Sequence, residues 1–248
     1  MENGCAMGPR EKCEDWQLRA GDYRSLISDP DFDSKFLRES GLIPNLLDLI
    51  GDARSATLLD AGTGTGWLFE HVKPRSAHAC DIVAPPPLPG NVQFRQENVA
   101  SLSYPSETFD IIVASLLLIY CADLEGVCGE FRRIAKPKSG KLVVALMQPY
   151  FYRTGHVVNE GQFLITRDLS TPMSFPLNIA ERVGPFRYYY RPLPDYLNVL
   201  IKSGWVIAQI RDWFIDMHAY SNVRTNTKIQ RTGSIPLFTF IECRAGNQ

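Results

Sequence analysis

The residues with the clearest chemical potential lie in one stretch, Leu58-Leu59-Asp60-Ala61-Gly62-Thr63-Gly64-Thr65-Gly66-Trp67. A short apolar run ends there in an acid, and three glycines follow at alternate positions. Such a run before a glycine turn is typical of a buried parallel strand that enters a helix. Glycine lets a ligand approach the backbone closely, and the free N–H groups at a helix start attract negative charge. The stretch therefore predicts a site for a nucleotide-type cofactor.

The spacing of the glycines narrows the choice of cofactor. The dinucleotide fingerprint needs a third glycine three residues after the second, where this chain has Trp67. No G-x-x-x-x-G-K-[ST] occurs, which excludes a P-loop. Asp81 ends a second short strand, about 20 residues beyond the glycines. An acid at that distance typically accepts hydrogen bonds from ribose hydroxyls.

The whole series of blocks resembles the class I S-adenosylmethionine-dependent methyltransferases. Their motif I reads hydrophobic-hydrophobic-Asp-x-Gly-x-Gly-x-Gly, as residues 58–66 do. Residues 92–115 resemble the family's G-D-A-x-x-L-P-F…F-D passage, with Asn98 in place of the acid that contacts adenine. The amide of Asn98 keeps an acceptor oxygen. Residues 131–144 resemble the passage R-v-L-K-P-G-G-x-L-v-i, and the resemblance covers about residues 20–245 with every block in order.

The resemblance implies a doubly wound α/β fold of the Rossmann-like kind. Its sheet has seven mostly parallel strands in the order 3-2-1-4-5-7-6, with the last strand antiparallel. The sequence pattern predicts a helix over about 30–51 that ends at Gly51, and strand-helix alternation up to about residue 147. The later elements predicted are a third strand at 92–99, a helix at 193–203 and strands at 205–210 and 236–242.

The domain organisation predicted is a mobile tail over residues 1–20 and one methyltransferase domain over 21–248. Within it, residues 148–191 form a long, irregular insert on the substrate side, which is too long for an ordinary loop. The insert either lines a pocket as a lid or packs as a satellite core under the sheet edge. It is rich in phenylalanine and tyrosine, with Tyr150, Phe151, Tyr152, Phe163, Phe175, Phe186, Tyr188, Tyr189 and Tyr190.

The resemblance also implies which residues hold S-adenosylmethionine. Asp60 meets the methionine amino group beside the backbone of the glycine loop, Asp81 binds ribose, and Ser115 lies under the methionine portion. Ile82, Asn98 and Val99 frame the adenine, and a segment near residue 23 covers the cofactor. The full set predicted is Asp60, Ala61, Gly62, Thr63, Gly64, Asp81, Ile82, Asn98, Val99, Ser115, Tyr23 and Arg24.

Methyl transfer needs the nucleophile, the methyl group and the sulfur in line, and a proton acceptor helps when the nucleophile is a hydroxyl or an acidic carbon. Residues 189–198 resemble Y-H-R-P-L-S-x-Y-L-N of small-molecule methyltransferases, with the histidine replaced by Tyr190. Asp195 in this passage is either a cap or exposed carboxylate near a helix start, or a substrate contact. The candidate catalytic residues are His156, Tyr190 and Tyr120, and the candidate substrate-binding residues are Tyr150, Tyr152, Tyr189 and Asp195.

Composition limits the partners and the compartment. A chain of 248 residues with 45% hydrophobic residues is enough for one domain. The net charge of -1 gives no reason to expect nucleic acid. The six cysteines have no metal-ligand spacing, and the longest apolar run is too short to span a membrane. We therefore expect a cytoplasmic monomer or homodimer with a small-molecule substrate, no metal, no nucleic acid and no membrane partner.

The acceptor is expected to be a small, partly aromatic or apolar molecule, as in natural product biosynthesis. Base-modifying amino methyltransferases carry [DN]-P-P-[YF] after strand four, where this chain has Ser115-Leu116-Leu117-Leu118. Two alternatives stay open. One is a protein of the same fold that binds S-adenosylmethionine but performs other chemistry, because fold does not settle chemistry. The other is a regulatory or scaffold subunit that needs a protein partner.

Overall fold

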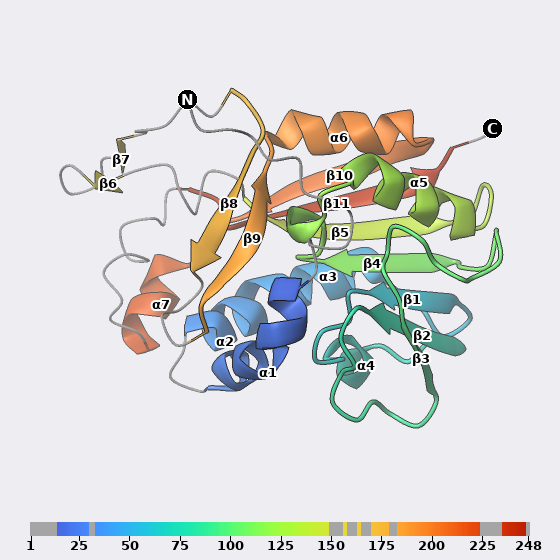
Figure 1. Ribbon diagram of the computed structural model, residues 1–248, viewed down its shortest axis with the longest axis horizontal. Helices are drawn as coiled ribbons and strands as arrows, with labels where there is room; N and C mark the ends of the chain where they lie inside the picture. The colour runs from blue at the N-terminus through green and yellow to red at the C-terminus, as the bar shows by residue number, and fades with distance from the viewer. Residues whose placement is uncertain are drawn as a thin grey trace.

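A computed structural model describes residues 14–29, 33–148, 156–157, 163–164, 170–178, 183–223 and 235–246. Its centre is a seven-stranded sheet in the spatial order β3-β2-β1-β4-β5-β11-β10 (Figure 1). The strands of this sheet are β1 Thr57–Ala61, β2 Ser76–Asp81, β3 Val92–Gln96, β4 Ile111–Ser115, β5 Lys141–Met147, β10 Trp205–Trp213 and β11 Phe238–Ala245.

Strand directions in this sheet confirm the predicted fold class. β1 pairs in parallel with β2 and β4, β2 with β3, and β4 with β5. β11 runs antiparallel to both β5 and β10. Counted along the chain within this sheet, the order is therefore 3-2-1-4-5-7-6 with the last strand reversed.

Two hydrophobic cores flank the sheet because alternate residues of its central strands face opposite sides. Ile112 and Ala114 of β4 enter the core beneath α5 and α6, whereas Ile111 and Val113 enter the core beneath α3 (Figure 1). The described helices are α1 Glu14–Ser28, α2 Asp33–Leu37, the π-helical η1 Arg38–Leu42, α3 Ile43–Ile50, α4 Leu68–His71, the 3-10 helix η2 Leu118–Tyr120, α5 Leu124–Ile134, α6 Leu193–Lys202 and α7 Met217–Val223.

The predicted tail over residues 1–20 is wrong for residues 14–20, because they belong to helix α1. Residues 1–13 lie outside the described residues. The helix predicted at about 30–51 is confirmed from Asp33 to Ile50, where α2, η1 and α3 follow without a break. Gly51 ends it with a φ of 66°, a left-handed conformation that favours glycine.

The predicted strand-helix alternation holds only in part. α4 between β1 and β2 has four residues, and α5 joins β4 to β5. No helix joins β2 to β3 or β3 to β4, a region that the structure describes throughout. The β2–β3 connection contains Pro85, Pro86, Pro87 and Pro89, and proline lacks the N–H group that a helix interior requires.

The insert after β5 is also more regular than predicted. β8 Met173–Asn178 pairs antiparallel with β9 Pro185–Tyr190, and the short β6 His156–Val157 pairs with β7 Phe163–Leu164. Phe186, Tyr188 and Tyr190 occupy alternate positions of β9 and are all buried. On this face of the β8–β9 hairpin the insert therefore packs into a core, as the second of the two alternatives for the insert stated. Among the described helices, none is long and apolar enough to cross a membrane.

Candidate active site

The glycine loop follows β1 directly and is fixed by backbone geometry. Gly62, Gly64 and Gly66 have φ values of 69°, 58° and 77°, which side-chain-bearing residues rarely adopt. The amides of Gly62 and Thr63 donate to the Cys80 carbonyl of β2, at 2.8 and 3.1 Å. The loop therefore sits at the carboxyl ends of β1 and β2, where open parallel sheets bind ligands.

The helix expected beyond this loop is only α4, one turn long. Two of its early amides donate to nearby carbonyls, Phe69 to Gly66 and Glu70 to Trp67, both at 3.1 Å. A single turn has a small dipole and few free N–H groups. The loop backbone and the acids around it therefore matter more for a ligand than the helix start does.

Asp60 is a buried carboxyl group at the base of the loop. Its side chain is 3% exposed, and Oδ2 accepts a hydrogen bond from Thr63 Oγ1 at 2.7 Å. Burial raises the pKa of Asp60 to about 7, the Thr63 bond lowers it, and the charge of Asp81 raises it further. A cationic group placed beside Asp60 would favour its ionised form.

Asp81 is the last residue of β2, and its side chain contacts the glycine loop from that strand. Its Oδ2 accepts from the Gly64 amide at 2.9 Å, and its Oδ1 accepts from the Val83 amide at 3.0 Å. Burial raises the pKa of Asp81, while the amides and the charge of Arg24 lower it. A third amide, that of Ile82, also donates to this carboxylate. Of its roughly four acceptor positions, three are therefore used by the backbone.

The other predicted cofactor residues surround the same edge. Ile82 follows β2, and its carbonyl accepts from Gln96 Nε2 at 3.0 Å. Asn98 is exposed just beyond β3, and its Oδ1 accepts from the Ala100 amide at 3.0 Å, so this oxygen is already engaged. Val99 is 7% exposed beside it. Ser115 is the last residue of β4.

Helix α1 carries Tyr23 and Arg24 to this edge. Arg24 Nη2 donates to the Ala84 carbonyl at 2.6 Å, in the loop that follows β2. Tyr23 is half-buried, and its ring packs against Phe186 of β9 and Trp16 of α1. Arg24 thus contacts the loop after β2, and the helix that carries both residues begins in the segment predicted as a tail.

The turn after β4 brings a further chain segment to the glycine loop. Leu116 has a φ of 55°, which is unusual for a residue with a side chain and costs about 1 kcal/mol or more. Leu117 then lies over the loop, because a Cβ built on Gly62 would be 2.8 Å from Leu117 Cδ1. Tyr120 ends η2 three residues later and is half-buried.

The three candidate bases differ in their surroundings. Tyr120 is half-buried at the end of η2, three residues after Leu117, which contacts the glycine loop. Tyr190 is 2% exposed and belongs to the core that contains α5 and α6. His156 lies in β6, where only the backbone is described. Since a general base must reach the proton that it removes, Tyr120 is better placed than Tyr190.

The candidate substrate residues are spread over the insert and α6. Tyr189 is half-buried at the outward face of β9, and the guanidinium of Arg191 lies 5.5 Å from its ring centroid. Asp195 is half-exposed in the first turn of α6, whose N-cap is Pro192, so Asp195 is a carboxylate near a helix start rather than the cap itself. Its charge still suits a helix start. Tyr150 and Tyr152 lie outside the described residues.

Sequence reasoning missed two residues that organise this edge. Trp16 of α1 was assigned to the tail, although Trp16 and Tyr23 are seven residues apart and so share one helix face. Arg191 donates from Nη2 to the carbonyls of Cys121 and Ala122, at 2.9 and 2.8 Å. It therefore ties the start of α6 to the segment after η2.

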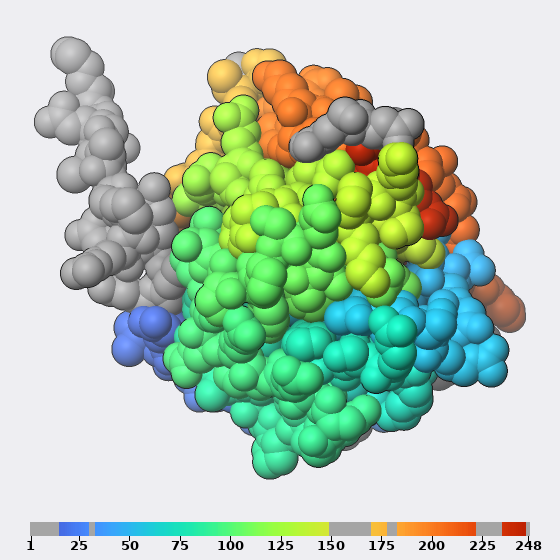
Figure 2. Space-filling view, turned by 90° about the vertical axis from the view of Figure 1, so that its right-hand side faces the viewer, coloured from blue at the N-terminus to red at the C-terminus, as the bar shows by residue number. Residues whose placement is uncertain are grey.

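A cavity of about 300 Å³ lies at the opposite edge of the sheet, near the amino ends of the parallel strands, on the side that faces the viewer in Figure 2. Lys141, Asp110 and Arg244 contribute to its lining. The ammonium of Lys141 donates to the Leu49 and Ile50 carbonyls, and Asp110 binds Lys136 at 2.8 Å. Its charged groups are thus engaged in holding elements together, and ligands of this sheet type bind at the other edge.

The sequence profile of a family described as "Methyltransferase domain" matches residues 35–164, more than half of the 248 residues. Comparison with curated proteins gives no significant match.

Three solved structures illustrate the structural similarity. An S-adenosylmethionine-dependent methyltransferase from Mesorhizobium loti matches with a TM-score of 0.63 and 19% identity, covering 81% of this chain and 96% of that one. The 1,6-didemethyltoxoflavin-N1-methyltransferase of Burkholderia thailandensis, with bound 1,6-didemethyltoxoflavin and S-adenosylhomocysteine, matches with a TM-score of 0.59 and 15% identity, covering 99% and 94%. The [4+2]-cyclase SpnF matches with a TM-score of 0.52 and 15% identity, covering 84% and 80%.

At these identities the structural likeness shows the fold alone. The family profile extends from α2 through the glycine loop, β4 and β5 into the insert, and the sheet order agrees with it. Together these findings show that the chain belongs to the class I S-adenosylmethionine-dependent methyltransferases.

Proposed function

We propose that this chain transfers the methyl group of S-adenosylmethionine to an O, N or C nucleophile of a small, partly aromatic or apolar molecule. The observation that carries the proposal is the meeting of two acids at the glycine loop. Asp60 lies buried at its base, and Asp81 holds the Gly64 amide from the neighbouring strand. Both acids stand at the sheet edge where a nucleoside would bind.

The cofactor would use the acceptor capacity that the acids still have. Asp81 accepts backbone amides on both oxygens, and its remaining acceptor capacity would take a ribose hydroxyl. Asp60 would pair with the methionine ammonium, and Ser115 would lie below the methionine chain. Ile82 and Val99, from the ends of neighbouring strands, would enclose the adenine.

The chemistry proposed is a single displacement. A lone pair of the acceptor atom forms a bond to the methyl carbon while the carbon–sulfur bond breaks, and sulfur keeps that electron pair as a neutral thioether. A hydroxyl or acidic carbon also loses its proton to a base. We propose Tyr120 for that role ahead of His156 and Tyr190, because its segment contacts the glycine loop.

The acceptor class rests on the aromatic side chains of the same edge. Tyr120 and Tyr189 are half-buried, and α1 adds Trp16 and Tyr23. Such rings bind planar aromatic molecules by stacking or edge-to-face contact. The structurally similar methyltransferase from Burkholderia binds 1,6-didemethyltoxoflavin, which is consistent with a small-molecule acceptor here.

Calorimetric titration with S-adenosylmethionine and S-adenosylhomocysteine tests the cofactor site. We expect micromolar binding that Asp81→Ala weakens at least about tenfold, since it removes the ribose contact and the hydrogen bond that holds the Gly64 amide. Asp52→Ala is the matched control, because Asp52 is an exposed acid paired with Arg54 at the other edge. Absence of binding to either ligand in the wild type would contradict the proposal.

A second candidate function is a cofactor-bound protein that performs other chemistry. The similarity to SpnF, a cyclase, shows that this fold occurs with another reaction. Formation of S-adenosylhomocysteine with a panel of small aromatic acceptors separates the two. Product release with any acceptor supports methyl transfer, whereas tight cofactor binding without turnover across the panel favours the alternative.

A further inference from the structure

The cavity at the amino ends of the parallel strands brings two positive side chains together. Its volume of about 300 Å³ falls at the lower end of the range for ligand pockets, about 300–1,000 Å³. Lys141 at the start of β5 and Arg244 near the end of β11 both line it. The two residues are partners in the antiparallel ladder, so their side chains lie next to each other on one face of the sheet. Like charges in such a pair repel and lower stability unless a negative charge compensates them.

Lys141 fastens β5 to α3 and still keeps a donor. Its ammonium donates to the Leu49 carbonyl at 2.8 Å and to the Ile50 carbonyl at 3.0 Å. An ammonium has three N–H donors, so one remains for a further acceptor. Burial lowers the pKa of Lys141, the charge of Glu242 raises it, and the charge of Arg244 lowers it again. Lys141 is therefore a half-buried cation in surroundings that disfavour its charge.

The acids that line the cavity are paired with other cations. Asp110 binds the ammonium of Lys136 at 2.8 Å, and Asp52 binds the guanidinium of Arg54 at 2.8 Å. Within the described part of the chain, neither carboxylate forms an ion pair with Lys141. The compensating charge for Lys141 therefore does not come from these two acids.

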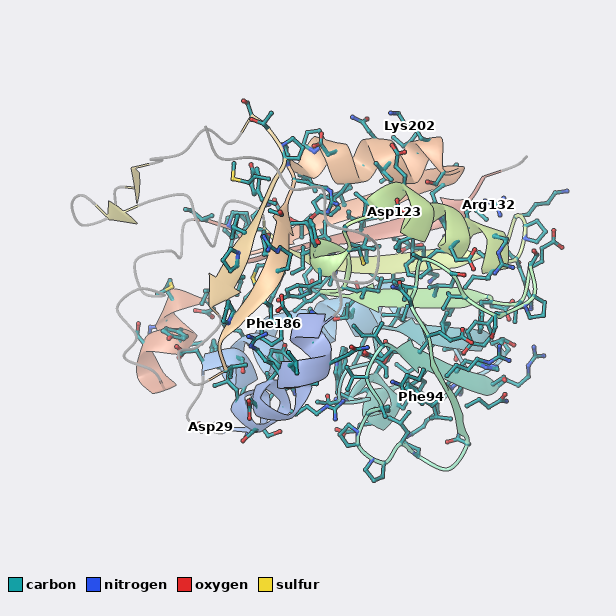
Figure 3. The ribbon with its side chains drawn as sticks, in the orientation of Figure 1. Asp29, Phe94, Asp123, Arg132, Phe186 and Lys202 are labelled. Carbon is teal, nitrogen blue, oxygen red and sulfur yellow. The ribbon has the colours of Figure 1, made fainter. Side chains whose placement is uncertain are left out.

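Arg244 also keeps donors while its segment is held in place. Its Nη2 pairs with Oε1 of Glu242, two residues earlier in β11. A guanidinium has five N–H donors, so this pair leaves several of them. Arg132 of α5, labelled in Figure 3, donates from its Nη2 to the Gly246 carbonyl at 3.0 Å and fixes the chain just after β11. The two cations are thus anchored at adjacent positions with donors to spare.

We propose that this cavity binds a phosphate group between the ammonium of Lys141 and the guanidinium of Arg244, with the hydroxyls of Ser55 and Ser139 as further donors. A phosphate carries up to two negative charges and accepts hydrogen bonds on several oxygens, so one ligand compensates both cations. A lysine that only fastened β5 to α3 would be more stable without a second cation opposite it. The site is independent of the proposed function, because it lies at the other edge of the sheet from the glycine loop.

Thermal melts in inorganic phosphate, compared with sodium chloride at the same ionic strength, test the site. In about 10 mM phosphate the Tm should rise by about 3–5 °C, the shift expected for a Kd of about 1 mM. This shift should fall below about 1 °C in Lys141→Met and in Arg244→Gln. Lys141→Met also removes the bonds to α3, whereas Arg244→Gln keeps them. Each shift is measured against the same variant without phosphate, so a lower starting stability does not change it.

Lys202→Met is the matched control. Lys202 is an exposed lysine of α6, which covers the opposite face of the sheet from α3 (Figure 3). Its phosphate shift should equal that of the wild type, because any general stabilisation by the salt acts on all variants alike.

Glycerol 3-phosphate in place of inorganic phosphate distinguishes the two sources of the group. A larger shift identifies a phosphomonoester as the ligand, and an equal or smaller shift identifies free phosphate. A wild type with no phosphate shift, or a shift that persists in both Lys141→Met and Arg244→Gln, would overturn the site and leave the proposed function intact.

Discussion

The sheet edge at the carboxyl ends of the parallel strands has two halves, and they are built in different ways. In the half at β1 and β2, the polar groups lie between Asp60 and Asp81 in the sequence. Hydrogen bonds between residues close in the chain join them, such as the bond from the Gly64 amide to Asp81, 17 residues away. On the side of η2, the rings come from α1, η2 and β9, and the bond between Asp15 and Arg187 spans 172 residues. The first half is formed by one strand-loop-strand unit, whereas the second exists only when distant elements dock.

This difference predicts how the halves respond to change. Damage to the glycine loop should abolish cofactor binding directly. A substitution that weakens the packing of α1 should loosen the half formed by α1, η2 and β9, while the two acids and the glycine loop stay in place. The opposite edge of the sheet belongs to neither half and provides a reference for effects on stability alone.

The largest effect is expected for Gly62→Val. A β-branched residue is strained at a φ of 69°, and its Cβ would lie 2.8 Å from Leu117 Cδ1. Calorimetry should show cofactor affinity reduced at least about 100-fold. Gly90→Val is the control, since a Cβ there meets nothing within 4 Å. Unchanged binding by Gly62→Val would show that this half does not depend on the loop.

Asp60→Asn should stabilise the empty protein and weaken the cofactor site. A carboxyl group with a pKa raised to about 7 in the folded state holds its proton longer than in the unfolded chain. The stability it contributes is present below about pH 4 and is lost as the pH rises through about 7.

Thermal melts between pH 5 and 8 measure this effect. The difference in Tm between Asp60→Asn and the wild type should grow in favour of the variant as the pH rises, by several degrees at pH 8. Cofactor affinity should fall about tenfold because the ammonium loses a charged partner. A constant difference in Tm across this range would contradict a raised pKa of the Asp60 carboxyl group in the folded protein.

Asp15→Ala should loosen the ring half with a moderate effect. It removes the bond from the Arg187 amide and the pair with Arg19, in a side chain that is 40% exposed. We expect a loss of about 1 kcal/mol in stability and faster amide exchange over α1. Asp22→Ala on the same helix is the control, because Asp22 is exposed. Equal exchange in both variants would argue against docking through Asp15.

The smallest effect on stability is expected at the opposite edge of the sheet, which serves as the reference. Lys138 is exposed in the turn before β5 and has a φ of 62°. Lys138→Gly should raise stability by about 0.5–1 kcal/mol because it relieves that strain. Lys138→Ala keeps the strain and should give no gain. Cofactor affinity should be the same in both, and a change would show that the two edges are coupled.

The sequence predicted the first half well because its signals are local. Alternate glycines, an acid before them and an acid one strand later stand close together in the chain, and the structure joins them at Gly64. The sheet order followed from the same blocks. The one-turn α4 and the proline-rich connection after β2 were missed, because helices were expected by analogy between every pair of parallel strands.

The second half was harder because its signals depend on distant contacts. α1 has little amphipathic pattern, and its packing comes from β9 and η2, so Trp16 looked like part of a tail. The alternation of Phe186, Tyr188 and Tyr190 is a strand signal, but the unbroken run of three tyrosines obscured it. Tyr190 was a candidate base because it replaces the histidine of the resembling passage, whereas the structure buries it.

A crystal structure of the complex with S-adenosylmethionine tests the central claim most directly. We predict a ribose hydroxyl on Asp81, the methionine ammonium near Asp60 and the methionine chain beside Ser115. A ligand bound elsewhere, or a cofactor whose ribose does not contact Asp81, would contradict the assignment of this edge as the methyl-transfer site.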